Sequence, residues 1–213
     1  MTTHTRNSSK ELGEINDNSY SLYTKLLLKT GAIFWHLIDR TSCRSKMVSN
    51  WYHKTVGGSY KKESEEFNLG EGKNILHIGC GFYPITAITL AENDGVKVTT
   101  IDKNPKALEY AKKVVKKKKL DKKITISQGQ GTKFPLDPFD IIIISGCSVP
   151  KIEVLNHVFN NAKSDSKIIV RESFLDIDSI INKFNNNNLK IVKRIMNYPF
   201  FSTSWESIYL LKK

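Results

Sequence analysis

The fold of this chain is decided by residues 74–91, which read NILHIGCGFYPITAITLA. The stretch predicts a short apolar strand, a tight turn and then a helix. Gly79 and Gly81 allow the backbone to bend sharply and to approach a ligand closely. Pro84 suits the first turn of a helix, where its missing N–H is not needed. Because the free N–H groups and the positive end of that helix would face the turn, the stretch predicts a nucleotide-type site at the carboxyl end of a strand.

An acidic residue ends the next apolar stretch. Residues 96–101 predict a second strand, and Asp102 follows it. An acidic side chain about 20 residues beyond such a glycine turn binds ribose hydroxyls. The alternative is that the glycines only shape a turn and that Asp102 only caps the following helix. The order of strand, Gly-x-Gly, helix, strand and Asp favours the binding site.

The turn does not fit two common nucleotide motifs. Pro84 stands where the dinucleotide fingerprint has its third glycine, and its ring would lie where helix and strand pack closely. No Gly-Lys-Ser/Thr follows, so the turn is not a P-loop.

Residues 74–213 resemble class I S-adenosylmethionine-dependent methyltransferases. The resemblance rests on the glycine turn, on Asp102, and on the stretch Phe139-Asp140 followed by apolar residues. It implies a Rossmann-like fold and S-adenosylmethionine as cofactor, with the turn beside the methionine part, Asp102 on the ribose and Gln130-Gly131 beside the adenine. The implied cofactor contacts are Gly79, Cys80, Gly81, Tyr83, Asp102, Lys103, Gln130, Gly131 and Ser145.

Three positions depart from that family's usual pattern. His77 replaces an acid two residues before the first glycine, Tyr83 replaces the third turn glycine, and Gln130 replaces an Asp near the adenine. The side-chain oxygen of Gln130 can still accept a hydrogen bond from an adenine amino group.

The turn itself also resembles that of nicotianamine synthases and their relatives. The similarity is confined to Gly79, Gly81, Pro84, Thr86, Ile88, Leu90 and Ala91. That resemblance implies transfer of the aminocarboxypropyl group of the same cofactor instead of its methyl group.

Length and composition predict one domain with an accessory segment in a cytoplasmic protein. The chain has 213 residues, of which 39% are hydrophobic and 25% charged. No apolar stretch is long enough to span a bilayer, and the polar N-terminus does not read as a signal peptide. Cys43, Cys80 and Cys147 are odd in number and lack metal-ligand spacing, which predicts a reduced, intracellular protein without a metal site.

The formal net charge of +12 marks a basic protein. Ten lysines lie between Lys103 and Lys123, most of them in a cluster at residues 112–123. The cluster fits a face that binds RNA or anionic lipid. The alternative is a solvated helix end, which is favoured because no aromatic residues lie between these lysines to stack on bases.

Three segments are expected along the chain. Residues 1–17 are polar and predict a disordered tail, residues 18–70 a helical cap, and residues 71–213 a cofactor-binding domain. Within the cap, apolar spacing predicts helices over residues 19–39 and 42–53. These helices fit a packed pair, a lid over the cofactor or, less well, a membrane-surface helix.

From residue 73 onward strands and helices alternate. Strands are predicted at residues 74–78, 96–101, 124–127, 141–145, 167–171, 189–196 and 207–211, and helices at 84–92, 105–117, 151–161 and 178–185. Such alternation predicts a doubly wound α/β fold, with a mostly parallel seven-stranded sheet covered by helices on both faces. The resemblance implies that the last two strands form an antiparallel hairpin.

No short catalytic signature stands out. Tyr83 in the turn and Glu172 after the fifth strand are weak catalytic candidates, with a packed aromatic and a surface or capping acid as the alternatives. Cys147 reads better as a small buried residue than as a nucleophile, and His77 as a hydrogen-bonded structural residue.

These observations predict an S-adenosylmethionine-dependent methyltransferase for a small-molecule acceptor. The Asn/Asp-Pro-Pro-Tyr motif of amino-methylating enzymes is absent, because residues 145–150 read SGCSVP. The alternatives are an aminocarboxypropyl transferase, an RNA methyltransferase that uses the lysine cluster, and a non-catalytic cofactor-binding protein.

Overall fold

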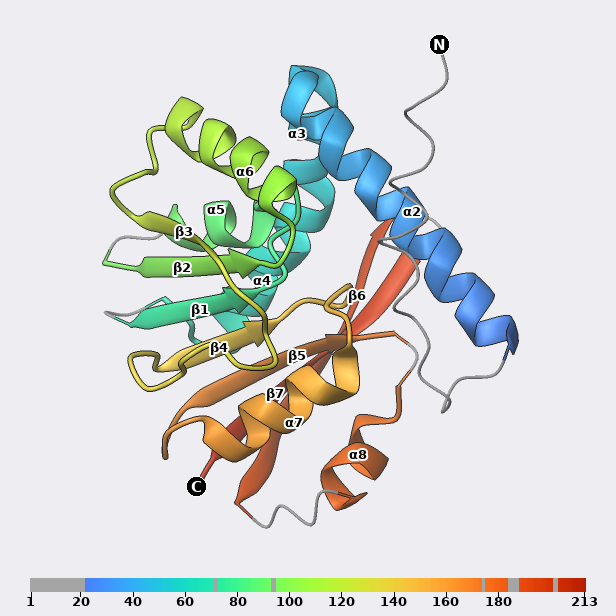
Figure 1. Ribbon diagram of the computed structural model, residues 1–213, viewed down its shortest axis with the longest axis vertical. Helices are drawn as coiled ribbons and strands as arrows, with labels where there is room; N and C mark the ends of the chain where they lie inside the picture. Colours follow the sequence, from blue (N-terminus) through green and yellow to red (C-terminus); the bar gives the residue numbers. More distant parts are fainter. Residues whose placement is uncertain (1–21, 71–72, 93–94, 174, 184–187, 201–202) are drawn as a thin grey trace.

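A single seven-stranded sheet runs through the centre of the computed structural model, which describes residues 22–213 apart from 71–72, 93–94, 174, 184–187 and 201–202 (Figure 1). The strands are β1 (Asn74–Ile78), β2 (Lys97–Asp102), β3 (Ile124–Gln128), β4 (Ile141–Ile144), β5 (Lys167–Glu172), β6 (Leu189–Phe200) and β7 (Thr203–Lys212). Their order across the sheet is β3-β2-β1-β4-β5-β7-β6. The first five strands are parallel, and β7 and β6 join antiparallel.

Two hydrophobic layers cover the two faces of the sheet. Side chains alternate along a strand, so Ile141 and Ile143 of β4 point into one layer and Ile142 and Ile144 into the other. All four are fully buried, as expected of a central strand covered on both faces.

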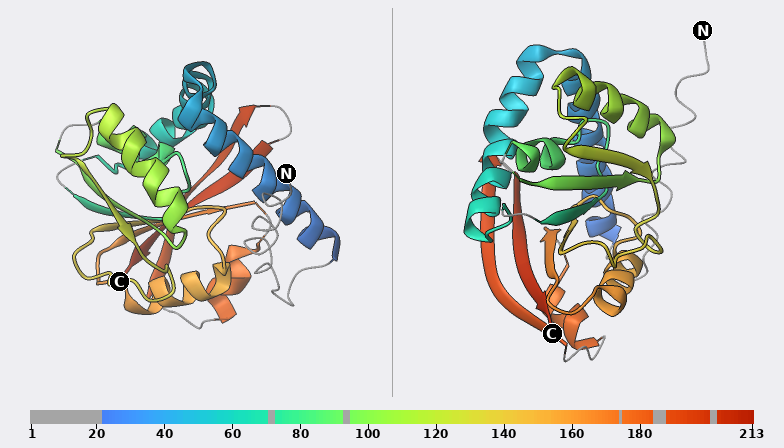
Figure 2. Two further views of the ribbon diagram at one scale, coloured as in Figure 1. Left: turned by 45° about the horizontal axis from the view of Figure 1, so that its top comes forward. Right: turned by 90° about the vertical axis from the view of Figure 1, so that its left-hand side faces the viewer.

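Helices pack on both faces (Figure 2). α4 (Gly58–Glu66) and α5 (Ile85–Ala91) cover one face, together with the end of the longer α6 (Pro105–Lys117). α7 (Lys151–Asn161) and α8 (Ile177–Lys183) cover the other face. These observations confirm the predicted doubly wound, mostly parallel fold with its C-terminal antiparallel hairpin. None of the helices in the described part of the chain is long and apolar enough to cross a membrane.

The N-terminal helices differ from the predicted pair. α2 (Leu22–Arg44) continues past Asp39, where the sequence pattern predicted its end, and α3 (Lys46–Tyr52) begins after a break at Ser45. The Ser45 hydroxyl makes that break because it accepts a hydrogen bond from Val48 N, as an N-cap does. The predicted tail and the predicted start of the first helix lie outside the described residues.

Two further helical segments follow α3 and were not predicted. A π-helical turn, η1 (His53–Gly57), leads directly into α4. Hydrophobic periodicity missed α4 because its two buried residues, Glu63 and Ser64, are polar. Tertiary contacts rather than an apolar stripe hold this helix in place.

The C-terminal hairpin is longer than predicted. β6 continues to Phe200 and β7 begins at Thr203, so the hairpin extends beyond the predicted ends at Met196 and Ser207. The register shifts between Asn197 and Phe200, a segment that contains Pro199. Proline has no N–H for a strand ladder and is tolerated at such an irregularity. Through this extension Phe200 reaches Trp51, with ring centroids 4.9 Å apart.

We predict that Ile142→Ala lowers the free energy of unfolding by about 2–5 kcal/mol, since it leaves a cavity in a fully buried strand. Urea unfolding followed by circular dichroism measures this loss. Val192→Ala on β6 is the control, because Val192 is exposed and its substitution is expected to change stability little. An equal loss in both variants would contradict the buried position of β4.

Candidate functional site

The glycine turn links the carboxyl end of β1 to α5. Gly79 and Gly81 have φ angles of 88° and 63°, in the left-handed region that suits glycine. The N–H groups of Gly79 and Cys80 donate to Ile101 O, which ties the turn to β2. A Cβ on Gly79 would lie 2.7 Å from Ser148 Oγ, so the turn also packs tightly on the loop after β4. Both glycines are therefore required by backbone shape and by close contact.

Asp102 and the glycine turn form one hydrogen-bonded unit. Asp102 Oδ2 accepts from Gly81 N at 2.9 Å, and Oδ1 accepts from Asn104 N at 3.0 Å. The carboxylate is partly exposed at the carboxyl edge of the sheet. Each oxygen keeps further lone pairs, so Asp102 can still accept hydrogen bonds from the hydroxyls of a bound ligand.

His77 supports the turn from inside the sheet. Its Nε2 lies 2.7 Å from Ser145 Oγ and its Nδ1 3.0 Å from Thr100 Oγ1, while Ser145 Oγ donates to Gly79 O. Burial lowers the pKa of His77 to about 3, so the ring is neutral near pH 7. A neutral imidazole that bridges two hydroxyls agrees with the structural role expected for this histidine.

The other predicted cofactor contacts lie at the same edge of the sheet but differ in exposure. Lys103 and Gln130 are exposed, and Ser145 is partly buried. A Cβ on Gly131 would lie 2.6 Å from Ile78 Cγ2, so this glycine packs on β1 and α7 rather than lining an open surface. Cys80 is buried beside Leu108 and Ala111 of α6.

Asp39 reaches the turn from α2, and the sequence pattern gave no sign of it. Its Oδ2 accepts from Phe82 N at 3.2 Å, and a Cβ on Gly81 would overlap this oxygen. Burial raises the pKa of Asp39 to about 7, although hydrogen bonds from the Tyr52 hydroxyl and from the backbone of the turn act in the opposite direction. Figure 1 shows why α2 can supply this group: the strands of the parallel sheet point toward that helix.

Tyr83 packs under the N-terminal helices. It is buried, its ring lies against Tyr52, and its hydroxyl is 2.9 Å from His53 Nε2. Burial lowers the pKa of His53 to about 4 and raises the pKa of Tyr83 to about 12. Near neutral pH the pair is therefore a neutral imidazole and a protonated phenol, joined by a hydrogen bond.

Glu172, the second catalytic candidate, is the last residue of β5 and is buried. Its Oε1 accepts from the N–H of Ser173 at 2.8 Å, and its Oε2 lies 3.5 Å from Lys151 Nζ. Lys151 also donates to the carbonyl oxygens of Ser145 and Arg171, at 2.8 Å each. The structure thus places Glu172 in a set of contacts that joins β4, β5 and α7.

Cys147 is exposed, which contradicts its prediction as a buried residue, because the loop after β4 turns it outward.

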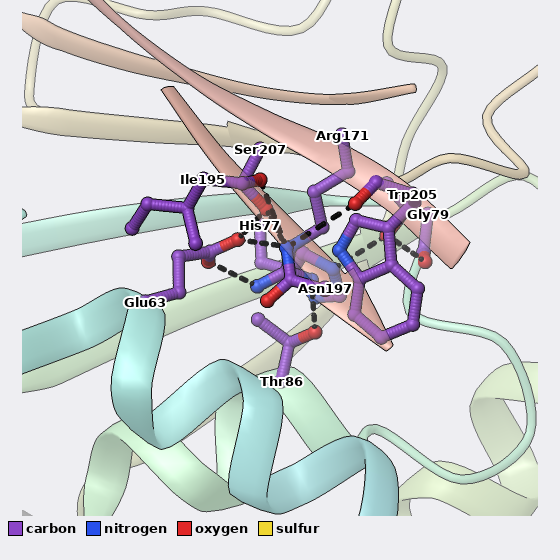
Figure 3. A network of polar contacts seen from close by, with 10 residues as sticks. Glu63, His77, Gly79, Thr86, Arg171, Ile195, Asn197, Trp205 and Ser207 are labelled. Carbon is purple, nitrogen blue, oxygen red and sulfur yellow. Dashed lines mark hydrogen bonds and ion pairs between the residues drawn. The ribbon is translucent and has the colours of Figure 1, made fainter. Parts of the chain in front are cut away.

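A buried ion pair joins the helical layer to the sheet beneath the turn (Figure 3). Arg171 of β5 donates to both carboxylate oxygens of Glu63 from α4, at 2.6 and 3.0 Å, and to Thr86 Oγ1 of α5 at 2.7 Å. Ser207 of β7 donates to the same carboxylate. The Arg171 guanidinium also lies 3.6 Å from the centre of the Tyr60 ring.

Residues 69–207, well over half of the chain, match the family model described as a methyltransferase domain. A curated relative from Methanococcus maripaludis, named protein-L-isoaspartate O-methyltransferase, is 35% identical over 92 residues. This match covers 41% of the chain and 43% of the relative, so the chain spans less than half of that protein.

Solved structures share the fold at low sequence identity. A point mutant of the protein named MtNAS superposes with a TM-score of 0.69 at 18% identity, over 88% of this chain and 73% of that one. MtNAS in complex with MTA and tNA gives a TM-score of 0.67 at 18% identity, covering 89% and 74%. A structure described as a SAM-dependent methyltransferase from Aquifex aeolicus gives 0.60 at 17% identity, covering 76% and 92%.

We predict that Glu63→Gln lowers the free energy of unfolding by about 3–5 kcal/mol, because it leaves the Arg171 charge buried and unneutralised. Chemical denaturation measures the loss. Glu66→Gln on the same helix is the matched control, since Glu66 pairs with Lys193 at the surface and its removal is expected to cost far less. The double variant Glu63→Gln/Arg171→Met is expected to recover part of the stability, and a cost for Glu63→Gln no larger than for Glu66→Gln would contradict the buried pair.

We predict that His77 makes the folded protein less stable at acid pH. The folded state keeps His77 neutral down to about pH 3, whereas the unfolded chain protonates it near its ordinary pKa of 6.5. Stability from this group is therefore complete above pH 6.5 and is lost as the pH falls, by up to about 1.4 kcal/mol per pH unit. Urea unfolding between pH 7 and pH 4 should show a shallower loss for His77→Asn than for the unchanged protein. Equal slopes would count against a neutral buried His77.

Proposed function

This chain belongs to the methyltransferase domain family, and from that premise we propose that it transfers a methyl group from S-adenosylmethionine to a small-molecule acceptor. The unit formed by Asp102 and the glycine turn carries the proposal. It holds a carboxylate with free lone pairs beside a tight backbone turn at the carboxyl edge of a parallel sheet, where open α/β folds bind nucleotides. A point mutant of MtNAS has been solved with S-adenosylmethionine, and it shares this fold.

The residues at this edge suit the parts of the cofactor. Asp102 would hold the ribose hydroxyls, the exposed amide of Gln130 would contact the adenine, and Gly79 to Gly81 would lie beside the methionine part. Cys80, Tyr83, Lys103, Gly131 and Ser145 complete the proposed set. The sulfonium of S-adenosylmethionine is already an activated leaving group, so the protein mainly aligns donor and acceptor and removes a proton where the acceptor requires it.

The acceptor's lone pair attacks the methyl carbon in line with the sulfur–carbon bond. That bond breaks with its electron pair on sulfur, which leaves S-adenosylhomocysteine, and the acceptor loses a proton. The Tyr83 hydroxyl bonds the neutral ring of His53, whose low pKa makes it a weak base, so in this proposal Tyr83 positions cofactor or acceptor through its hydroxyl and the acceptor's proton passes to water. We place Tyr83, in the turn itself, ahead of Glu172 as the candidate catalytic residue, because the oxygens of Glu172 already bind Ser173 and Lys151.

Two features favour a small acceptor over RNA. The helices α2 and α3 lie over the carboxyl edge of the sheet, where Asp39 and Tyr52 contact each other beside the turn. The lysine cluster at residues 112–123 occupies the end of α6 and the loop that enters β3. That loop is at the amino edge of the parallel sheet, opposite the glycine turn, so a polyanion bound there would be centred away from the proposed cofactor site.

Aminocarboxypropyl transfer is a second candidate, favoured by the extent of one structural match. A superposition over 88% of this chain is longer than the segment from Leu69 to Lys213, so it includes part of the N-terminal helices. MtNAS has been solved with MTA, the thioether that remains when the larger group leaves the cofactor. In this reaction the acceptor attacks the methylene carbon of the aminocarboxypropyl group, which is bonded to sulfur, instead of the methyl carbon.

We predict that the protein binds S-adenosylmethionine in calorimetry and that Asp102→Ala raises the dissociation constant about 5- to 150-fold. The physical reason is the loss of charge-assisted hydrogen bonds to the ribose. Asp121→Ala, at an exposed residue before β3, is the control and should leave binding unchanged. No binding at millimolar cofactor would refute the proposed function, and unchanged affinity in Asp102→Ala would refute the role of that residue.

Product analysis distinguishes the two candidate reactions. With an accepted substrate, methyl transfer yields S-adenosylhomocysteine, whereas aminocarboxypropyl transfer yields methylthioadenosine. Chromatography of the nucleoside products separates them. Methylthioadenosine formed in proportion to acceptor would replace the first candidate with the second.

A further inference from the structure

Asp39 is a carboxylate that neither the glycine motif nor the family pattern assigns to the site. It comes from α2, yet its Oδ2 accepts from Phe82 N and lies against Gly81. The position two residues before Gly79, where the family pattern has an acid, holds the neutral ring of His77. The negative charge near the methionine end of the site is therefore supplied from another part of the chain.

Two carboxylates flank the turn on opposite sides. Asp102 accepts from Gly81 N, and Asp39 accepts from the next N–H in the chain, that of Phe82. The charge of Asp102 raises the pKa of Asp39, and both carboxylates raise the pKa of Cys80 in the turn. The Tyr52 hydroxyl and Phe82 N both donate to Asp39, which fixes the carboxyl group and favours its charged form against the effect of burial. Like charges this close repel, so a cation between them is favoured.

We infer that Asp39 is a binding residue for the sulfonium and ammonium groups of the cofactor, and that Asp39 and Asp102 together make the site prefer S-adenosylmethionine to its thioether products, which lack the sulfonium charge. This inference rests on the proposed function. S-adenosylmethionine carries a sulfonium, an ammonium and a carboxylate, which leaves one net positive charge. S-adenosylhomocysteine keeps only the ammonium and the carboxylate and has no net charge, and methylthioadenosine has none of the three groups. A carboxylate beside the methionine end therefore contributes more to binding as the ligand carries more positive charge.

The preference would also help turnover. Either group transfer converts the sulfonium into a thioether and removes one positive charge next to Asp39. The product then lacks the attraction that held the substrate cofactor, so it is released more readily. Because Asp39 belongs to α2, losing the sulfonium charge also weakens the attraction between α2 and the bound product.

The test compares three ligands in two proteins. Asp39→Asn keeps an oxygen that can accept from Phe82 N but removes the charge. We expect its affinity for S-adenosylmethionine to fall about tenfold or more, its affinity for S-adenosylhomocysteine to fall less, and its affinity for methylthioadenosine to stay unchanged. An equal loss for the first two ligands would overturn the preference for the sulfonium. Calorimetry gives the three dissociation constants. Glu109→Gln removes the same charge from an exposed position on α6 and should change none of them.

Other outcomes overturn the inference. An equal loss for all three ligands would mean that Asp39 only holds the fold. A gain in affinity would mean that the carboxylate occupies space that the cofactor needs and must be displaced. Normal cofactor binding by the unchanged protein, together with unchanged affinities in Asp39→Asn, would refute the inference alone. Failure of the unchanged protein to bind S-adenosylmethionine would refute the proposed function beneath it.

A pH series gives a second measurement, in which the unchanged protein is compared with Asp39→Asn at each pH. Asp39 has a pKa of about 7, so it gains its charge between pH 6 and pH 8, and affinity for S-adenosylmethionine should rise over this range. The titratable groups that interact electrostatically with Asp39 are Tyr52, Tyr60 and Tyr83, Cys43 on its own helix, Cys80 in the turn, Asp102 at the end of β2 and Cys147 after β4. Burial raises the pKa of Cys43 to about 12 and holds the pKa of Tyr52 well above 10, so neither changes charge in this range. Dividing by the affinity of Asp39→Asn at each pH cancels the ligand's own titration, and a flat ratio would overturn the inference.

Discussion

One buried guanidinium group determines how the layers of this molecule fit together. Arg171 lies in β5, with both faces of the sheet covered, so its charge has no access to bulk water. A buried charge is tolerated only with an opposite charge and satisfied hydrogen bonds. Glu63 supplies the charge, and Thr86 supplies a further acceptor from the helix that starts at the glycine turn. Because Glu63 of α4 and Thr86 of α5 both bond Arg171, this group fixes α4 beside α5 and so helps to position the N-terminal helices near the turn.

Sequence reasoning worked where the signals were local. Residues 74–91 combine a strand, two glycines with required positive φ and a proline, and each of these constrains its own neighbours, so β1, the turn and α5 were predictable. Asp102 was predictable for the same reason, since it ends a strand at a fixed distance from the glycines. The alternating apolar and polar segments after it were enough to predict a parallel sheet and its C-terminal hairpin.

The features that the sequence did not predict depend on contacts between residues that are far apart in the chain. Glu63 and Arg171 are 108 residues apart, and each reads as a solvent-exposed charge when taken alone. Asp39 is 43 residues from the backbone that it contacts, within a helix whose apolar pattern seemed to end there. Cys147 looked like a small core residue because it follows four buried isoleucines, but the chain turns outward within three residues. Periodicity reports which face of an element is buried, and it cannot report which polar residues pair across elements.

The aromatic contact between the C-terminal hairpin and the N-terminal helices sets the order in which the molecule can be assembled during synthesis. Phe200 packs on Trp35 and Trp51, with ring centroids 5.9 and 4.9 Å apart, so the helices over the site rest on a strand near the end of the chain. A ribosome releases α2 and α3 long before β6 exists, and contacts between such distant segments form slowly. The helices that carry Asp39 and Tyr52 therefore keep the apolar side chains that meet Phe200 uncovered until β6 has been made. A nascent chain of this protein has a complete glycine turn well before it has a closed site.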